Sequence, residues 1–245
     1  MRAAAGRTLI GAALAAAAPA FAGQFGGSVA LTSDYVYEGL SRTCGGPAAQ
    51  ADLHASGTGP MATFGGVWGS AGVGDDYCRA AREVDLYLGE RWALDASNSV
   101  ALRYVHYAYP GGIYLYEGLE GHRLDYDELG ATWAFEDRFQ LTLGWTPNAA
   151  EYRDYRLVRD RSAVHFGGEL HQPLGQWLTL SAGAGYDQVS DFTGAGYAFW
   201  SAGLGRTVGP IALDLSYFRT SPRAERLFGA QVAGGRVAAT AVWRF

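Results

Sequence analysis

The chain has 245 residues, of which 49% are hydrophobic and 13% aromatic, with 35 Gly and a formal net charge of −5. No stretch after residue 22 reaches the roughly 18 consecutive apolar residues of a transmembrane helix, which excludes a helical membrane protein. The length fits a single domain, and no Pro-rich linker or charge block divides it. The acidic balance also argues against nucleic acid as a partner.

Residues 1–22 have the pattern of a cleaved signal peptide. Arg2 and Arg7 form a basic start, Leu9–Ala18 an apolar run, and Ala20–Ala22 a small-x-small cleavage site. The run is too short to span a bilayer as a helix. We therefore expect residues 23–245 to be one exported domain, and removal of the two Arg takes its formal charge to −7.

Strand-like segments with alternating apolar residues fill this domain. Most have about the length that a tilted strand needs to cross a bilayer. The twelve segments are 28–39, 47–56, 61–70, 82–93, 99–109, 124–135, 138–147, 161–172, 177–187, 197–207, 211–219 and 235–245. Short turns alternate with long links between them, as periplasmic turns alternate with extracellular loops in outer-membrane proteins. The sequence thus predicts an all-β fold, an antiparallel up-and-down transmembrane β-barrel of 12 strands.

The faces of these segments fit a barrel. In 138–147 and 177–187, apolar residues alternate with Gly, Ser, Thr and Gln, which suit a narrow lumen better than bulk water. All seven Trp lie within about three residues of a predicted strand end, the positions of the two aromatic girdles of a membrane barrel. The girdle residues are Trp68, Trp92, Trp133, Trp145, Trp177, Trp200 and Trp243.

The last segment, 235–245, has apolar residues at every second position and ends on Trp243, Arg244 and Phe245. A terminal Phe on such a strand resembles the closing strand of bacterial outer-membrane barrels. The resemblance implies that Trp243 and Phe245 form an assembly signal read by the barrel-assembly machinery. An ordinary terminal strand of a soluble sheet is the alternative.

A family resemblance rests on the first half of the chain. Val29–Tyr37, followed by Gly39, Leu40 and Ser41, is similar to the opening strand of the TorF-type porin family of proteobacteria. Further matches are Pro47, Gln50, Glu83–Gly89, Tyr107, Tyr109, Pro110 and Gly111. The resemblance implies a small outer-membrane channel of unassigned substrate. Glu38 departs from the family pattern, in which Arg is usual at this position.

Signals for catalysis or metal binding are weak. Asn98 and Asn148 lie in connections on opposite sides of the membrane, which argues against the Asn–His–Ser triad of an outer-membrane lipase. His165 and His171 lie about 20 Å apart along one strand, too far for one metal, although His54 could approach either across the lumen. No helix follows Gly203, Gly205 and Gly209, so they suit lumen-facing positions better than a dinucleotide fingerprint. We expect no enzyme, no cofactor and no metal site.

Passive diffusion of small hydrophilic solutes through a monomeric pore is the leading functional prediction. If the apolar set of each strand faces lipid, nine carboxylates and three Arg face inward, and the pore prefers cations weakly. The predicted wall residues are Asp34, Glu38, Asp52, Glu83, Asp85, Arg103, Glu128, Glu169, Asp187, Asp214, Arg236 and Arg244. A lipid hydrolase, and a closed barrel that displays its loops as an adhesin or assembly partner, stay open as alternatives.

Two predictions concern the long loops. Cys44 and Cys78 lie in the first and second loops on the same side, so an exported chain is expected to join them in a disulfide. The fourth loop carries mixed charge, which indicates a solvated cap that could also contact lipopolysaccharide phosphates. Its charged residues are Glu151, Arg153, Asp154, Arg156, Arg159, Asp160 and Arg161.

Overall fold

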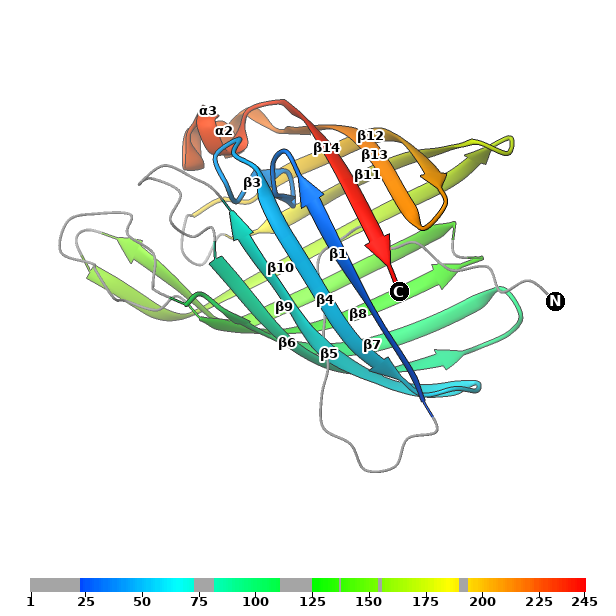
Figure 1. Cartoon of the computed structure of the whole chain (residues 1–245). Coiled ribbons are helices and arrows are strands. Elements are labelled where there is room, and N and C mark those ends of the chain that lie inside the picture. Colours follow the sequence, from blue (N-terminus) through cyan, green and yellow to red (C-terminus); the bar gives the residue numbers. More distant parts are fainter. Residues whose placement is uncertain (1–22, 73–81, 111–124, 137, 154–155, 190–193) are drawn as a thin grey trace.

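Twelve antiparallel strands close into a barrel in the computed structural model (Figure 1). The structure describes residues 23–72, 82–110, 125–136, 138–153, 156–189 and 194–245, and the side chains of 150–161 lie outside the description. The barrel strands are β1 (Gln24–Thr32), β4 (Ala48–Ser56), β5 (Met61–Gly72), β6 (Arg82–Ala93), β7 (Asn98–Ala108), β8 (Tyr126–Phe135), β9 (Phe139–Arg153), β10 (Arg156–Leu174), β11 (Leu178–Gln188), β12 (Tyr197–Val208), β13 (Ile211–Thr220) and β14 (Arg236–Arg244). The predicted fold class and strand number are therefore confirmed. Residues 1–22 lie outside the description, so the signal peptide remains a prediction.

Alternation along each strand produces the two faces of the barrel. On β9, Leu141 and Leu143 are about half exposed, and on β13 Leu213 and Leu215 are similarly exposed. The residues between them point into the lumen and are smaller or polar. An apolar outer belt with a polar interior is the arrangement that lets a closed sheet lie in lipid.

The connections sort by length, as predicted, with one exception: β9 and β10 are separated by only two residues at the end where long links were expected. Five connections of two to four residues join β4–β5, β6–β7, β8–β9, β10–β11 and β12–β13 at one end of the barrel, here called the turn end. The connections of residues 33–47 and 221–235 lie at the opposite, loop end (Figure 1). In the β6–β7 turn, Asp95 accepts hydrogen bonds from the amides of Ser97 (2.7 Å) and Asn98 (2.8 Å), which fixes this tight reversal.

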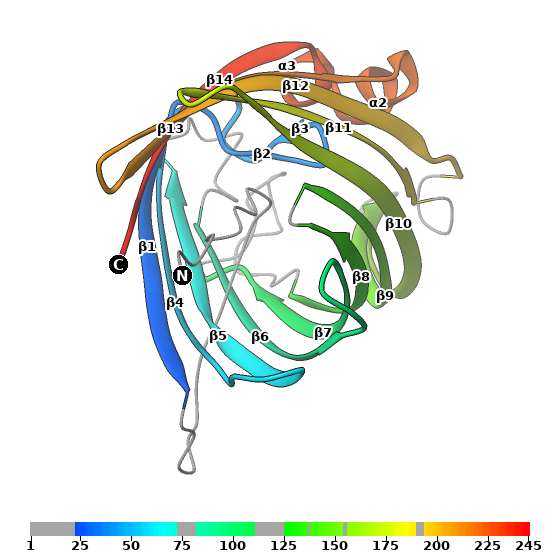
Figure 2. The same ribbon diagram turned by 90° about the vertical axis from the view of Figure 1, so that its right-hand side faces the viewer.

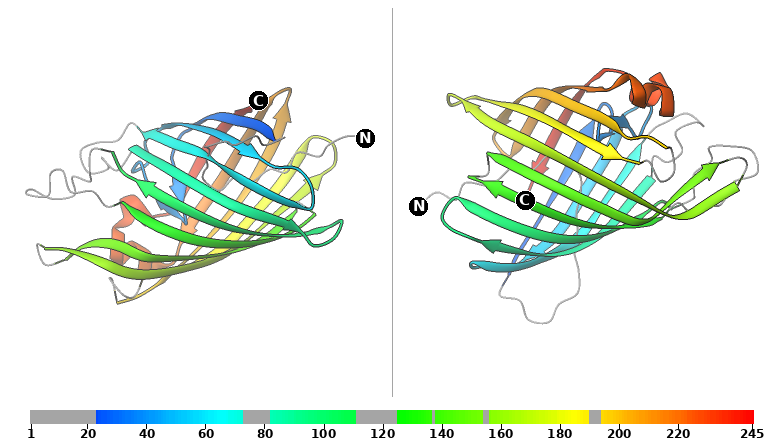
Figure 3. Two further views of the ribbon diagram at one scale, coloured as in Figure 1. Left: turned by 90° about the horizontal axis from the view of Figure 1, so that it is seen from below. Right: turned by 180° about the vertical axis from the view of Figure 1, so that it is seen from behind.

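Two predicted segments were drawn wrongly. The first strand ends at Thr32 and not at residue 39, because the chain then turns into the barrel. The predicted fourth loop is largely strand: β9 and β10 continue as a paired hairpin in which Arg156 faces Arg153 and Leu157 faces Tyr152. This hairpin extends past the loop end of the barrel (Figure 3).

Residues 33–47, here called the inward segment, fold into the barrel at the loop end (Figure 2). The segment holds the small hairpin β2 (Val36–Tyr37) and β3 (Leu40–Ser41). It meets two short helices of the last connection, α2 (Pro222–Phe228) and α3 (Ala230–Ala233). The contact is apolar and buries the side chains of Leu40, Val189, Tyr197, Ala224 and Ala233. The described residues include no helix long and apolar enough to cross a bilayer.

The tryptophan prediction was wrong for Trp68. Its side chain is only 6% exposed, because it points into the lumen and packs on Tyr35 of the inward segment, with ring centroids 5.4 Å apart. Trp145, Trp177, Trp200 and Trp243 do lie on the outer face, with 43–65% of the side chain exposed. A position near a strand end does not reveal which face a ring occupies, and for Trp68 the inward segment supplied a buried partner.

Candidate functional site

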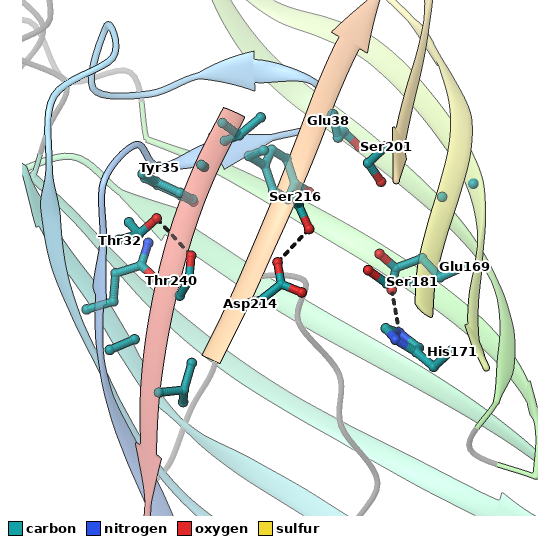
Figure 4. A pocket seen from close by; sticks show the side chains of 18 of the residues that line it. Thr32, Tyr35, Glu38, Glu169, His171, Ser181, Ser201, Asp214, Ser216 and Thr240 are labelled. Carbon is teal, nitrogen blue, oxygen red and sulfur yellow. Dashed lines mark hydrogen bonds and ion pairs between the residues drawn. The ribbon is translucent and has the colours of Figure 1, made fainter. Parts of the chain in front are cut away.

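A cavity of about 670 Å³ occupies the lumen between the inward segment and the turn end of the barrel (Figure 4). Tyr35, Tyr37 and Glu38 of that segment line it at the loop end. Strand residues near the turn end, such as Ser28 and Arg244, line its other end. The cavity is therefore bounded by the barrel wall and by one folded connection.

One side of the cavity is built from small and hydroxyl residues of β11 to β13. Ser181, Ser201 and Ser216 point into it, with glycines between them (Figure 4). At Gly203 a Cβ atom would collide with the Ser216 hydroxyl, so glycine keeps room for the neighbouring side chain. Gly203 and Gly205 lie on β12, as the strand interpretation predicted, but Gly209 does not: it lies in the β12–β13 turn, with a φ of 59° that favours glycine.

Carboxylates and histidines form close pairs along single strands of the cavity wall. His54 Nδ1 lies 2.6 Å from Asp52 Oδ2 on β4, and His171 Nε2 lies 3.6 Å from Glu169 Oε2 on β10. Glu169 also accepts a hydrogen bond from Gln140 Nε2 (2.9 Å). A neutral imidazole leaves each carboxylate charge in place, whereas a protonated one cancels it.

The inward segment is fixed to the wall by a buried ion pair. Arg236 Nη1 of β14 lies 3.0 Å from Asp34 Oδ2, and the two side chains are 12% and 4% exposed. Ser41 and Thr43 also donate their hydroxyls to Asp34. The Arg236 guanidinium further donates to carbonyl oxygens of the α3 region, at Gln231, Val232 and Gly234. One side chain thus joins the closing strand, the last connection and the inward segment.

A second contact joins the inward segment to the opposite wall. His165 Nδ1 of β10 lies 3.1 Å from Glu38 Oε1 and 3.5 Å from Glu128 Oε2 of β8. Asp187 of β11 contacts Glu38 as well. Burial raises the pKa of Glu38 well above its usual range, and the charges of Asp187 and Glu128 raise it further. Glu38, Glu128 and Asp187 therefore surround His165 at the loop end of the cavity.

The predicted wall residues fall into two groups. Those that line the cavity are Asp34, Glu38, Asp52, Arg103, Glu169, Asp214 and Arg244. The others, Glu83, Asp85, Glu128, Asp187 and Arg236, lie outside its lining, in the contact zone between the inward segment and the wall. Arg103 contacts Glu128 at 3.7 Å and so connects the two groups. Their role in conduction remains a prediction.

The described residues give no support to the catalytic or metal patterns. They include no group of three or more His, Cys, Asp or Glu side chains arranged to hold a metal ion. Asn98 and Asn148 were predicted in connections but lie on strands: Asn98 begins β7 and bonds Asp95, whereas Asn148 lies on β9 and bonds Asp127 on β8. His171 and Ser181 are cross-strand neighbours, but they point into the lumen and not toward lipid (Figure 4).

Two predictions fall partly outside the description. Cys44 lies in the inward segment and its thiol is not free, but Cys78 lies outside the described residues, so the Cys44–Cys78 disulfide remains a prediction. Of the fourth-loop charges, Asp154 is outside the described residues and the side chains of the others are too.

Sequence reasoning missed Arg42 and the tyrosines around it. Arg42 lies 5.2 Å from the centre of the Tyr37 ring, and Tyr107 stacks on Tyr126 with centroids 4.5 Å apart. Large inward side chains at Val105, Tyr107 and Tyr109 were a usable signal, since an open narrow pore favours small residues there. They show that the loop end of the lumen is packed.

The barrel resembles solved membrane barrels. A chain from a study of the in-meso crystallisation of membrane proteins aligns with a TM-score of 0.60 and 11% identity, over 91% of this chain and 83% of that chain. The NanC porin, in a rhombohedral crystal form, aligns with a TM-score of 0.50 and 9% identity, over 89% of this chain and 98% of that one. At such identities the likeness shows the fold alone.

A search of curated proteins finds no match to the sequence. A family profile described as "Bacterial protein of unknown function (Gcw_chp)" matches residues 16–244. The TorF-type resemblance is a finer assignment than this match gives, and it remains a prediction. The match covers nearly the whole chain, which therefore belongs to the Gcw_chp family of bacterial proteins.

Proposed function

We propose that this protein is an outer-membrane channel for passive diffusion of small hydrophilic solutes, with a weak preference for cations. The observation that carries the proposal is the polar cavity of about 670 Å³ inside a closed barrel. Its lining holds five carboxylates, Asp34, Glu38, Asp52, Glu169 and Asp214, against two guanidinium groups, Arg103 and Arg244. An excess of fixed negative charge in a confined aqueous space raises the local cation concentration.

The fold supports the location and the non-enzymatic character of this role. A related barrel is a porin by its name, NanC, and the apolar outer belt of the present barrel fits a bilayer. In this proposal the barrel functions as a monomer. Lipids and lipopolysaccharide surround it, and small hydrophilic solutes pass through its lumen. An enzyme is disfavoured because the polar groups of the cavity are paired with one another, as His54 is with Asp52 and Ser216 with Asp214.

The preference for cations is tested by the reversal potential. Refolded full-length protein in a planar bilayer under a KCl gradient is expected to give a reversal potential of the sign that indicates a preference for K⁺ over Cl⁻. Asp214→Asn and Glu169→Gln each remove one lining charge, so each should move the potential toward zero. Glu136→Gln removes a carboxylate in the β8–β9 turn, outside the cavity, and should leave the potential unchanged. A potential of the sign that indicates chloride preference would contradict the proposal.

One observation favours a closed barrel as the second candidate. The inward segment buries Tyr35, Leu40 and Thr43, and these side chains fill the loop end of the lumen. A barrel sealed there would display its connections to a partner and conduct nothing. Reproducible insertion without any conductance steps would support this candidate and end the channel proposal. The lipid hydrolase is the weaker alternative, and hydrolysis of labelled phospholipid would revive it.

A further inference from the structure

Two aromatic rings cover the lumen wall on β5 and β6. Phe64 of β5 and Tyr87 of β6 both line the cavity and are partly exposed, with ring centroids 6.1 Å apart. Gly89 lies directly opposite Phe64, and a Cβ atom there would collide with the Phe64 ring. The ring therefore occupies the space over Gly89 and lies along the wall, which gives the cavity an aromatic side.

Polar side chains border these rings. The Tyr87 hydroxyl donates to Asp52 Oδ1 (3.4 Å), and Asp52 Oδ2 lies 2.6 Å from His54 Nδ1. Arg103 lies directly opposite Gly89 on β7 and also lines the cavity. Next to the rings, this side of the lumen thus offers a carboxylate that accepts hydrogen bonds and a guanidinium that donates them.

The opposite wall offers hydroxyls. In the order of the twelve strands, β11 lies six strands from β5 and β12 six strands from β6, in either direction around the barrel. Ser181 of β11 and Ser201 of β12 point into the cavity (Figure 4). A Cβ atom at Gly203 would lie 2.8 Å from Ser181 Oγ, and one at Gly183 would lie 2.9 Å from Ser201 Oγ. The glycines therefore leave room for the hydroxyls on this side.

The combination of the two walls selects among solutes. A simple ion is bound by groups of one kind, whereas this lining mixes an acceptor, Asp52, a donor, Arg103, and serine hydroxyls that do both. A sugar has the matching pattern, because its hydroxyls donate and accept while the C–H groups of its ring pack on aromatic faces. The cavity of about 670 Å³ also has the size of a small-molecule site, roughly 300–1,000 Å³.

We propose that the lumen binds a small neutral saccharide between the rings of Phe64 and Tyr87 and the serine hydroxyls of β11 and β12. The inference rests on the proposed function, because it names a solute class for the same lumen. The sugar ring packs on the aromatic side, and its hydroxyls replace water at Asp52, Arg103 and Ser201. Binding spread over several weak contacts lets the solute enter and leave again.

Equilibrium binding tests this inference without requiring conduction. Refolded full-length protein, in a detergent without a sugar headgroup, is titrated calorimetrically with maltose, and saturable binding is expected. Phe64→Leu keeps an apolar side chain but removes the ring, so it should raise the Kd about tenfold. Ser201→Ala removes one hydroxyl from the opposite wall and should raise the Kd about fivefold. Phe166→Leu makes the same exchange on the outer face, where Phe166 is 54% exposed, and should leave the Kd unchanged.

Current block in planar bilayers separates the inference from the channel proposal. Maltose is expected to reduce the single-channel current, at a half-blocking concentration that Phe64→Leu raises and Phe166→Leu does not. A conducting barrel that binds no maltose would overturn the saccharide site and leave the channel. Maltose binding to a barrel that never conducts would keep the site and end the channel proposal.

Two further outcomes would overturn the saccharide site. One is a Kd that stays at the wild-type value in Phe64→Leu or in Ser201→Ala. The other is tetramethylammonium bound in preference to maltose, which would indicate a site for organic cations. Heat-modifiable migration on a gel reports folding of each variant, and Ser201→Ala keeps the test open if Phe64→Leu does not fold.

Discussion

Arg236 joins the inward segment to two other parts of the chain. It pairs with Asp34 and donates to three backbone carbonyls of the last connection, at Gln231, Val232 and Gly234. The planar guanidinium can serve acceptors in several directions at once, which a lysine ammonium on a flexible stem does less well. The residue therefore acts as a rigid connector between parts of the chain that are remote in sequence.

We expect Arg236→Ala to destabilise the barrel by about 3 kcal/mol, because it leaves the buried Asp34 carboxylate without its ion-pair partner. Arg236→Lys should lie between Ala and the wild type. The free energy of unfolding in urea, followed by heat-modifiable migration, measures both. Asp34→Asn with Arg236→Ala completes a double-mutant cycle, and fully additive effects would show that the pair is not coupled.

Inward positions of single residues were partly predictable. The period of two places Asp52, Glu169 and Asp214 on the lumen face, and they line the cavity. The same rule could not reveal Arg42, since it lies in a connection where no period applies. The same rule places Glu83 and Asp85 side by side on the lumen face of β6, but it could not show that Tyr35 of the inward segment returns to bond Glu83.

The inward segment is the element that the sequence pattern misplaced. Its residues continue the alternation of β1, so Val29–Tyr37 looks like one strand until Asp34 finds Arg236, 202 residues away. A local pattern contains no information about such a distant partner. The longer β9–β10 hairpin was missed for a related reason. The charged residues near its turn resemble those of a loop, and only the pairing of β9 with β10 shows that this stretch is strand. By contrast, strands such as β6 (Arg82–Ala93) and β12 (Tyr197–Val208) were placed within a residue, because lipid on one side and lumen on the other impose strict alternation.

Docking of the inward segment should weaken as pH rises. The pKa of Glu38 is raised in the docked state, so protonation favours docking, and this contribution is lost as pH increases through the raised value. Single-channel conductance is expected to increase between pH 5 and pH 9. Glu38→Gln cannot ionise, and a variant that kept the wild-type pH profile would contradict this explanation.

Phe245 extends the contact between β1 and β14 that closes the barrel. The Phe245 amide donates to the Gly27 carbonyl (3.1 Å), and the Gly27 amide donates to the Phe245 carbonyl (3.0 Å), next to the β1–β14 pairs. A Cβ atom at position 27 would lie 2.8 Å from the Phe245 ring, so glycine allows the ring to pack there. The first and last strands thus meet around one aromatic side chain.

Deletion of Phe245 removes these hydrogen bonds and the terminal ring together. We expect a smaller fraction of heat-modifiable, folded protein in isolated outer membranes, with the remainder unfolded. Phe245→Tyr keeps the ring and the backbone bonds and serves as the matched control. Equal folded fractions for the deletion and the wild type would show that neither closure nor recognition by the assembly machinery depends on this residue.

The ion pair between Asp34 and Arg236 also sets an order of events in time. Asp34 leaves the export machinery among the first residues, whereas its partner, the helices α2 and α3, and the closing strand emerge last. The Asp34 side of the inward segment therefore lacks its partner while the sheet is still open, although Tyr35 and Glu38 can already meet Trp68 and His165 of earlier strands. Full docking then waits until the final hairpin has been added, which makes the Asp34–Arg236 contact a late step of assembly.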